Sequence, residues 1–267
     1  MQSFRLAAVA AAALALAVAG LPRLDQEPAG APAAAQQKVP TVPEAETGID
    51  FPVWLDLAVG EETVRHHMLG TGVREKTIFK VDVYGMAMYV DRLALGAELH
   101  ALAESIPSKN AGTDTRLADS LLEGRYAVSM RWVMARDVED EDVREAFDDW
   151  LGPRLDAAVA ATPEEERADA RRHADSVMTQ FRGLFSADLL EGEELRFAWL
   201  PGGHLHSWIR GEANPVVESE MLCRALWDCY VGRKAAEPKA RRAFLSGLWR
   251  LARAWEAPMA DKETSDE

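Results

Sequence analysis

An arginine and a tyrosine on one apolar segment are the residues of this chain best suited to bind a ligand. The segment LGTGVREKTIFKVDVYGMAMYVD, residues 69–91, places Arg74 ten residues before Tyr84. If the segment is one strand, this even spacing puts both side chains on the same face of a sheet. A guanidinium beside a phenol on an apolar wall can hold a carboxylate through charge-assisted hydrogen bonds. The pattern alone also allows a structural ion pair for Arg74 and a buried phenol for Tyr84.

Two methionines extend the same pattern. Met86 and Met88 share the parity of Tyr84, so a single strand would turn all three side chains to one face. Methionine is flexible and fills irregular apolar space, which suits a lipid-sized pocket as well as an ordinary core. We therefore predict that Met86 and Met88 help to line the apolar part of a ligand site.

Other kinds of chemistry have little support in the sequence. Gly70-x-Gly72 lacks the third glycine and the following helix of a dinucleotide loop, and the chain has no Walker lysine, G-x-S-x-G or C-x-x-C motif. Histidines form two close pairs, His66-His67 and His204-x-His206. The rings of His66 and His67 would point to opposite faces of a strand, and we interpret His204 and His206, which lie beside an exposed turn, as surface imidazoles rather than metal ligands. The sequence thus predicts no metal site, no cofactor and no catalytic residues.

The elements that must position these residues follow from apolar spacing and turn signals. Strands are predicted at 51–58, 63–69, 125–134, 194–200 and 204–210, and residues 74–90 are predicted to form one longer strand or a pair of strands, with Gly85 marking a bulge or bend. Helices are predicted at 93–105, 139–151, 164–184, 215–232 and 240–255, with caps at Asp137, Gly152 and Asn214-Pro215. Because these elements do not alternate as β–α–β units, we predict an α+β fold. A mostly antiparallel sheet would carry helices on one face.

The amino-terminal residues have the composition of a secretory signal. Arg5 precedes the uncharged run from Leu6 to Val18, and Ala17-Val18-Ala19 forms a small-residue cleavage site. The apolar run is shorter than the roughly 18–20 residues that span a bilayer, so an uncleaved anchor is the less favoured alternative. We predict a signal peptide at 1–19 and a periplasmic or secreted protein. A disordered linker at 20–48, one folded domain at 49–256 and a polar tail at 257–267 would follow.

The formal net charge of −14 limits the partners of the chain. Such an acidic surface does not attract nucleic acid or anionic lipid, and its self-repulsion favours a soluble monomer. The two cysteines, Cys223 and Cys229, are six residues apart within one predicted helix. This spacing places them on different helix faces, which is poor geometry for a mutual disulfide.

Residues 69–91 also resemble the signature of the chalcone isomerase-like family. The later segments YAVSMRWVMARDV, ELRFAWLPGGHLHSWIRG and ESEMLCRALWDCYVG resemble the central strand, a late hairpin and a late helix of that family, in the same order. The resemblance covers residues from Phe51 to Leu248. It implies an open-faced β-sandwich, in which a large antiparallel sheet is backed by helices with a ligand cleft between them.

The resemblance also implies which residues matter. True chalcone isomerases use an arginine at the position of Arg74 together with a threonine, a tyrosine, a lysine and an asparagine. Here the threonine position holds Tyr84, the acidic segment 139–146 replaces the tyrosine, lysine and asparagine, and the late hydroxyl position falls near Cys223. Tyrosine with a retained arginine resembles the fatty-acid-binding members of the family. We count Cys223 among the predicted ligand-contacting residues.

Three functions remain open at this point. The first is an exported protein that binds a small amphipathic carboxylate, such as a fatty acid, through Arg74 and Tyr84. The second is an isomerase or intramolecular lyase that acts on a phenolic or enone substrate. The third is a structural partner protein with a vestigial cleft. The loss of the catalytic polar residues favours the first of these, a binding protein without enzymatic activity.

Overall fold

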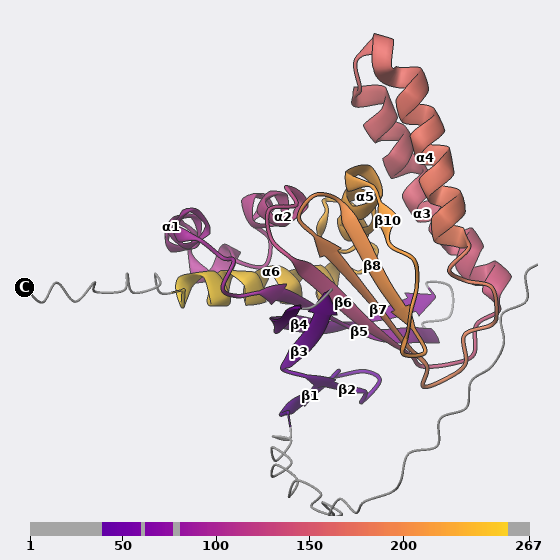
Figure 1. Cartoon of the computed structure of the whole chain (residues 1–267). Helices are drawn as coiled ribbons and strands as arrows, with labels where there is room; N and C mark the ends of the chain where they lie inside the picture. Colours follow the sequence, from indigo (N-terminus) through magenta and orange to yellow (C-terminus); the bar gives the residue numbers. More distant parts are fainter. Residues whose placement is uncertain (1–38, 60–61, 77–80, 256–267) are drawn as a thin grey trace, which may run out of the picture. The chain divides into compact units, whose positions relative to one another are not determined.

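An antiparallel sheet of eight strands is the centre of the folded part of the chain (Figure 1). The computed structural model describes residues 39–59, 62–76 and 81–255. The main path of the sheet runs, in spatial order, through β10 (Val217–Glu218), β8 (His204–Ile209), β7 (Glu194–Leu200), β6 (Val128–Met134), β5 (Val81–Asp91), β4 (Glu62–Lys76) and β3 (Trp54–Val59). Strand β9 (Glu212–Ala213) pairs with β8, and a separate hairpin pairs β1 (Thr41–Pro43) with β2 (Asp50–Pro52).

Helices pack against this sheet. They are α1 (Ala97–Ser105), α2 (Thr115–Leu122), α3 (Asp140–Ala161), α4 (Arg167–Arg182), α5 (Glu220–Val231) and α6 (Pro238–Arg253), with short 3₁₀ turns at Ser108–Asn110 and Glu164–Glu166. Helix α6 lies along β4, α3 packs on α5, and α3 pairs with α4. None of the helices in the described ranges combines the length and the apolar character needed to cross a membrane.

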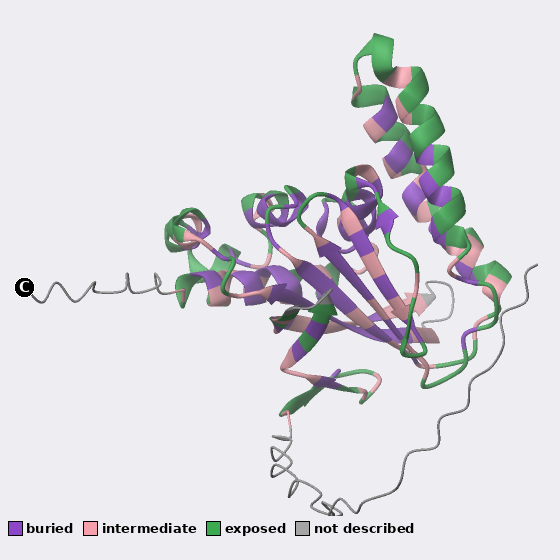
Figure 2. Cartoon of the chain, in the orientation of Figure 1, coloured by how far each residue is buried: buried purple, intermediate pink, exposed green. Residues whose placement is uncertain are grey.

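The two faces of the sheet carry two separate apolar cores. Alternate residues of β5, namely Tyr84, Met86 and Met88, belong to the large core between sheet and helices. Ala87 and Tyr89 point the other way, into a small core with Phe51 of β2 and Leu55 of β3. This alternation is the expected consequence of a strand that is buried on both faces, and Figure 2 shows β5 and β6 buried along most of their length. The predicted α+β fold is confirmed.

Glycines let α6 approach β4 more closely than other residues would. A Cβ atom built on Gly247 of α6 would lie 1.7 Å from the Leu69 carbonyl oxygen of β4. A Cβ atom on Gly72 of β4 would lie 2.4 Å from the Ala240 Cβ atom. The Gly70-x-Gly72 motif therefore serves helix-on-sheet packing.

Of the two arrangements predicted for residues 74–90, one longer strand or a pair of strands, the structure has the pair. Arg74 lies near the end of β4 and Tyr84 lies in β5, so they belong to two antiparallel strands rather than one. Residues 77–80 of this segment lie outside the described residues. The register shifts of this pair occur between Met68 and Gly70 and between Arg74 and Glu75, and not at Gly85.

Two helix boundaries also differ from the prediction. Helix α3 continues through Gly152 and Pro153 to Ala161, because its apolar stripe continues to pack beyond the expected end (Figure 2). The buried residues of this stripe are Val143, Phe147, Leu151, Leu155 and Val159. Helix α5 begins at Glu220 rather than near Pro215, since the Ser219 hydroxyl accepts a hydrogen bond from the Leu222 amide at 3.2 Å and provides the cap.

The amino-terminal boundary of the fold is earlier than residue 49. Strand β1 lies within the segment predicted as a linker, and its residues pair with β2. The Glu44 side chain accepts hydrogen bonds from the Glu46 and Thr47 amides at 3.0 and 2.8 Å, which stabilises the turn between the two strands. The predicted signal peptide at 1–19 and tail at 257–267 lie outside the described residues.

One histidine of the tandem pair His66-His67 is fully buried. The His66 Nδ1 atom lies 2.9 Å from the Ser129 hydroxyl, and both residues are inaccessible to solvent. Burial lowers the pKa of His66 to about 4. The imidazole is therefore neutral in the native protein at neutral pH, and it gains a proton more readily in the unfolded chain than in the fold.

We expect this histidine to destabilise the protein in acid. Between pH 6.5 and about 4 the unfolded state binds a proton that the native state excludes, so stability falls as the pH falls through this window. The loss from His66 alone is roughly 3 kcal/mol at the lower end. Urea melts of the wild type and of His66→Gln as a function of pH measure it. A smaller pH slope is expected for His66→Gln and an unchanged slope for His204→Gln; equal slopes in all three proteins would contradict the assignment.

Candidate functional site

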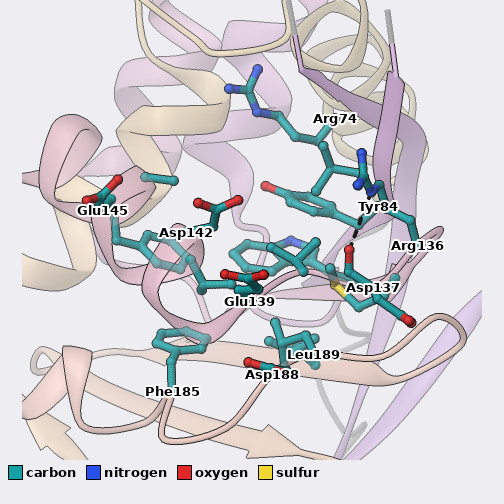
Figure 3. A pocket seen from close by; sticks show the side chains of 18 of the residues that line it. Arg74, Tyr84, Arg136, Asp137, Glu139, Asp142, Glu145, Phe185, Asp188 and Leu189 are labelled. Carbon is teal, nitrogen blue, oxygen red and sulfur yellow. Dashed lines mark hydrogen bonds between the residues drawn. The ribbon is translucent and has the colours of Figure 1, made fainter.

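A cavity of about 630 Å³ lies between the sheet and the first half of α3 (Figure 3). Its walls come from β4, β5, β6, β7 and α3, together with the segment between β6 and α3 and the segment that leads from α4 into β7. The apolar lining residues are Val83, Trp132, Met134, Val138, Val143, Ala146, Phe147, Trp150, Phe185, Leu189, Leu190 and Leu195. This volume is within the roughly 300–1,000 Å³ of typical small-molecule sites.

Arg74 and Tyr84 both line this cavity and are direct partners across β4 and β5. Residues that lie opposite each other on antiparallel strands have their side chains on the same face. The prediction that the two side chains share a face is therefore confirmed, although the geometric reason is cross-strand pairing and not parity along one strand. Figure 3 shows the Arg74 side chain lying beside the Tyr84 ring.

The Arg74 guanidinium is held by two neighbours. Its Nη1 atom donates a hydrogen bond of 2.7 Å to Glu237 Oε1, and both side chains are less than one fifth exposed. Its guanidinium carbon lies 4.3 Å from the centre of the Trp150 ring, in a cation–π arrangement. Glu237 is the residue that precedes α6, so the close packing of α6 on β4 brings this carboxylate to Arg74. The structural ion pair that the sequence left open is thus present.

The Tyr84 hydroxyl also has a partner. It lies 2.8 Å from the Tyr230 hydroxyl of α5, and both residues are buried. Burial raises the pKa of both phenols, so both stay protonated at ordinary pH. Two hydroxyls that share one hydrogen bond use one of their two protons. If Tyr230 donates to Tyr84, the Tyr84 proton remains available to a ligand in the cavity.

Aromatic rings form the wall behind this pair. Trp132 stacks on Tyr84 with 4.9 Å between ring centroids and lies 5.6 Å from Tyr230. The centroid of the Phe147 ring lies 6.1 Å from that of Trp132 and 5.1 Å from that of Phe185. Rings that are packed in this way are rigid and apolar, which suits a wall against which an aliphatic chain can lie.

The cavity lining is strongly acidic on the side of α3. Among the residues that the structure describes, six carboxylate residues line it, against two arginines, Arg74 and Arg136. The acids are Asp137, Glu139, Asp142, Glu145, Asp149 and Asp188. Figure 3 shows Asp142 and Glu145 on α3, with Glu139 just before the helix begins. Two residues of the acidic run at 139–142, Glu139 and Asp142, thus lie at the edge of a cavity.

Three residues predicted to contact a ligand lie elsewhere. Met86 and Met88 are fully buried in the main core and are not among the lining residues of the cavity. They lie further along β5, where α6 covers the neighbouring strand. Cys223 is fully buried in α5, and burial raises the pKa of its thiol. The cavity gives these three residues no role, whereas Tyr230 and Glu237, which no sequence motif indicated, hold the polar ends of Tyr84 and Arg74.

One group of carboxylates in the described ranges has a spacing that a metal ion could use. The ligand atoms of Glu46, Glu75 and Asp82 lie within 4.8 Å of one another. Glu46 also binds Lys239 at 3.0 Å, and its hydrogen bond with Glu75 raises the pKa of Glu75. Because acidic side chains near the surface often gather without an ion, we assign no metal to this group.

Comparison with known proteins shows the family of the chain. A family model described as chalcone isomerase like matches residues 64–245, and the chain therefore belongs to the chalcone isomerase-like family. Fatty-acid-binding protein 1 of Arabidopsis thaliana is 24% identical over 218 residues, covering 79% of this chain and 72% of that protein. Chalcone isomerase-like protein 1 of Humulus lupulus is 27% identical over 197 residues, which cover 73% of this chain and 84% of that protein.

A solved structure has the same fold. The crystal structure of the Arabidopsis thaliana fatty-acid binding protein superposes with a TM-score of 0.61 at 24% sequence identity, and the match covers 80% of this chain and 99% of that one. The shared architecture is the antiparallel sheet backed by helices. The fold that the sequence resemblance implied is thereby confirmed.

Proposed function

We propose that this protein binds a fatty acid in the cavity between β5 and α3, with the carboxylate at Arg74 and Tyr84. The observation that carries the proposal is the pairing of these two residues at the wall of a cavity that aromatic rings also line. A carboxylate that leaves water needs a fixed counter-charge and hydrogen bonds, and an arginine stays charged when it is partly buried. The resemblance to a fatty-acid-binding protein supports this ligand class.

The aliphatic tail supplies most of the affinity in this proposal. It would lie against Trp132, Phe147 and Phe185, and each buried methylene contributes about 0.8 kcal/mol. The acidic side of the cavity gives no long-range attraction for an anion, so recognition of the head group is local. Native mass spectrometry of the purified protein, followed by calorimetry with dodecanoate, tests the proposal. A co-purified lipid or saturable binding supports it, and a protein that binds no fatty acid of any length would contradict it.

We expect no cyclisation of chalcones. Of the polar positions that the family resemblance implies for catalysis, only Arg74 is retained, and the α3 segment supplies carboxylates that repel a developing oxyanion. A spectrophotometric assay with a simple hydroxychalcone should show the spontaneous rate at neutral pH. Turnover well above that rate would overturn the proposal that this is a binding protein, and would favour the isomerase alternative.

We further propose that the protein is exported. The proposal depends on Arg5, the apolar run from Leu6 to Val18 and the small residues at 17–19. The mature protein is expected to begin at or near Gly20 when the full chain is expressed in a bacterial host with a secretion pathway. Amino-terminal sequencing or intact mass measures this start. Protein that retains Met1 in the membrane fraction would show that the segment acts as an anchor.

A further inference from the structure

We propose that Glu237 is a built-in competitor of the ligand and occupies Arg74 when the cavity is empty. This inference rests on the proposed function, because it concerns the carboxylate that a bound fatty acid must replace. It assigns a specificity role to a residue that neither the sequence motif nor the cavity lining includes.

The bonding of Arg74 is the first observation. Its Nη1 atom lies 2.7 Å from Glu237 Oε1, and the Arg74 and Glu237 side chains are 18% and 16% exposed. A carboxylate held at hydrogen-bond distance by a guanidinium is the same arrangement that a fatty-acid head group would make. Glu237 therefore satisfies the positive charge of the site with a group from the protein itself.

The setting of Glu237 is the second observation. It immediately precedes Pro238, the first residue of α6, and its side chain makes no cap on that helix. The same Oε1 atom accepts a hydrogen bond from the Glu75 amide at 3.3 Å, which is long for such a bond. The carboxylate is thus held mainly by Arg74, and no helix cap is lost when it turns away.

The charge balance of the cavity gives the third observation. In the described part of the lining, six acidic residues outnumber the two arginines, and Arg74 is paired with Glu237. A ligand carboxylate that enters without displacing Glu237 meets no uncompensated positive charge at Arg74. For Arg74 to give its full charge to a ligand carboxylate, Glu237 must turn away, whereas an uncharged head group requires no such exchange.

With competition of this kind, the apparent affinity equals the intrinsic affinity multiplied by the fraction of molecules in which Arg74 is available. Removing the charge of Glu237 should tighten dodecanoate binding roughly ten-fold. Calorimetry with dodecanoate and with dodecanol on the wild type, Glu237→Gln and Glu141→Gln tests this. Glu141→Gln is the matched control, because it removes one negative charge at an exposed residue of α3 that is not in the cavity lining.

Tighter dodecanoate binding in Glu237→Gln alone, with unchanged dodecanol binding, is the expected result. Equal or weaker dodecanoate binding in a folded Glu237→Gln overturns the inference and leaves the proposed function intact. An equal gain for dodecanol also overturns it, since that would mean general loosening of the cavity. If the wild type and Glu237→Gln both fail to bind either ligand, the proposed function fails and the inference fails with it.

A measurement on the unaltered protein covers the case of a variant that does not fold. The Glu75 amide donates to the Glu237 carboxylate, so its NMR signal reports the position of Glu237. Dodecanoate is expected to shift the Glu75 amide signal, and dodecanol is expected to leave it in place. Saturation with dodecanoate without a shift of this signal would overturn the inference.

Discussion

Replacing Arg74 with alanine is expected to weaken fatty-acid binding by about 2–5 kcal/mol, which is roughly 30-fold to several thousand-fold in affinity. The variant loses the charge-assisted hydrogen bond to the head group, and it leaves Glu237 as an unpaired carboxylate beside the ligand. Both changes act in the same direction. Calorimetry with dodecanoate measures the effect after a melt has shown that the variant still unfolds cooperatively.

Two further variants separate this effect from general electrostatics and from folding. Arg136→Ala removes the same charge at an exposed residue of the cavity edge, and we expect it to change affinity by less than about three-fold. Arg74→Ala combined with Glu237→Gln avoids leaving a partly buried carboxylate unpaired. Equal affinities of the wild type and a folded Arg74→Ala would show that Arg74 serves only the ion pair with Glu237.

Loss of the Tyr84 hydroxyl should matter less for binding than for the fold. Tyr84→Phe removes one hydrogen bond to the ligand, worth about 0.5–1.5 kcal/mol. It also leaves the buried Tyr230 hydroxyl without its partner at 2.8 Å, which should cost a further 1–3 kcal/mol or so of stability. An affinity loss for Tyr84→Phe as large as that for Arg74→Ala would contradict a site in which the arginine dominates.

The second large effect is expected at the contact of α6 with β4. Gly247→Ala places a methyl group where the Leu69 carbonyl oxygen lies 1.7 Å away, so the helix must shift from the strand. We expect a loss of roughly 1–3 kcal/mol or more in the free energy of unfolding, by analogy with other overpacked cores. Because Glu237 precedes α6, fatty-acid binding should change as well.

Gly152 provides the matched control for this substitution. It lies within α3, and a Cβ atom added there meets no other atom within 4 Å. Gly152→Ala should therefore stabilise the protein by up to about 1 kcal/mol, through helix propensity alone. Urea melts of the two variants should move in opposite directions. Similar stability of Gly247→Ala and the wild type would mean that α6 is not held against β4 as closely as described here.

The sequence was sufficient to predict the architecture and the shared face of Arg74 and Tyr84. Alternating strands, a late hairpin at Pro201-Gly202-Gly203 and amphipathic helices are local patterns, and local patterns set the fold class. The shared face of Arg74 and Tyr84 was predicted correctly through an incorrect route. Even spacing along one strand and direct pairing across a hairpin lead to the same face.

What the sequence could not predict depends on contacts between distant residues. Tyr230 lies 146 residues from its partner Tyr84, and Glu237 lies 163 residues from Arg74. No local pattern marks either residue, and both reach the site only because α5 and α6 pack on the sheet. Met86 and Met88 share the parity of Tyr84 but are covered by the core, since parity gives the face of a residue and not its distance from a cavity.

The central claim is that a fatty-acid carboxylate binds at Arg74 with its tail in the cavity beside α3, and a crystal structure of the full chain with dodecanoate tests it most directly. We predict a carboxylate oxygen within hydrogen-bond distance of the Arg74 guanidinium, a tail against Trp132 and Phe147, and a Glu237 side chain turned away from Arg74. Dodecanoate bound elsewhere, or a head group among the acidic residues of α3 with Arg74 still paired to Glu237, would contradict the account.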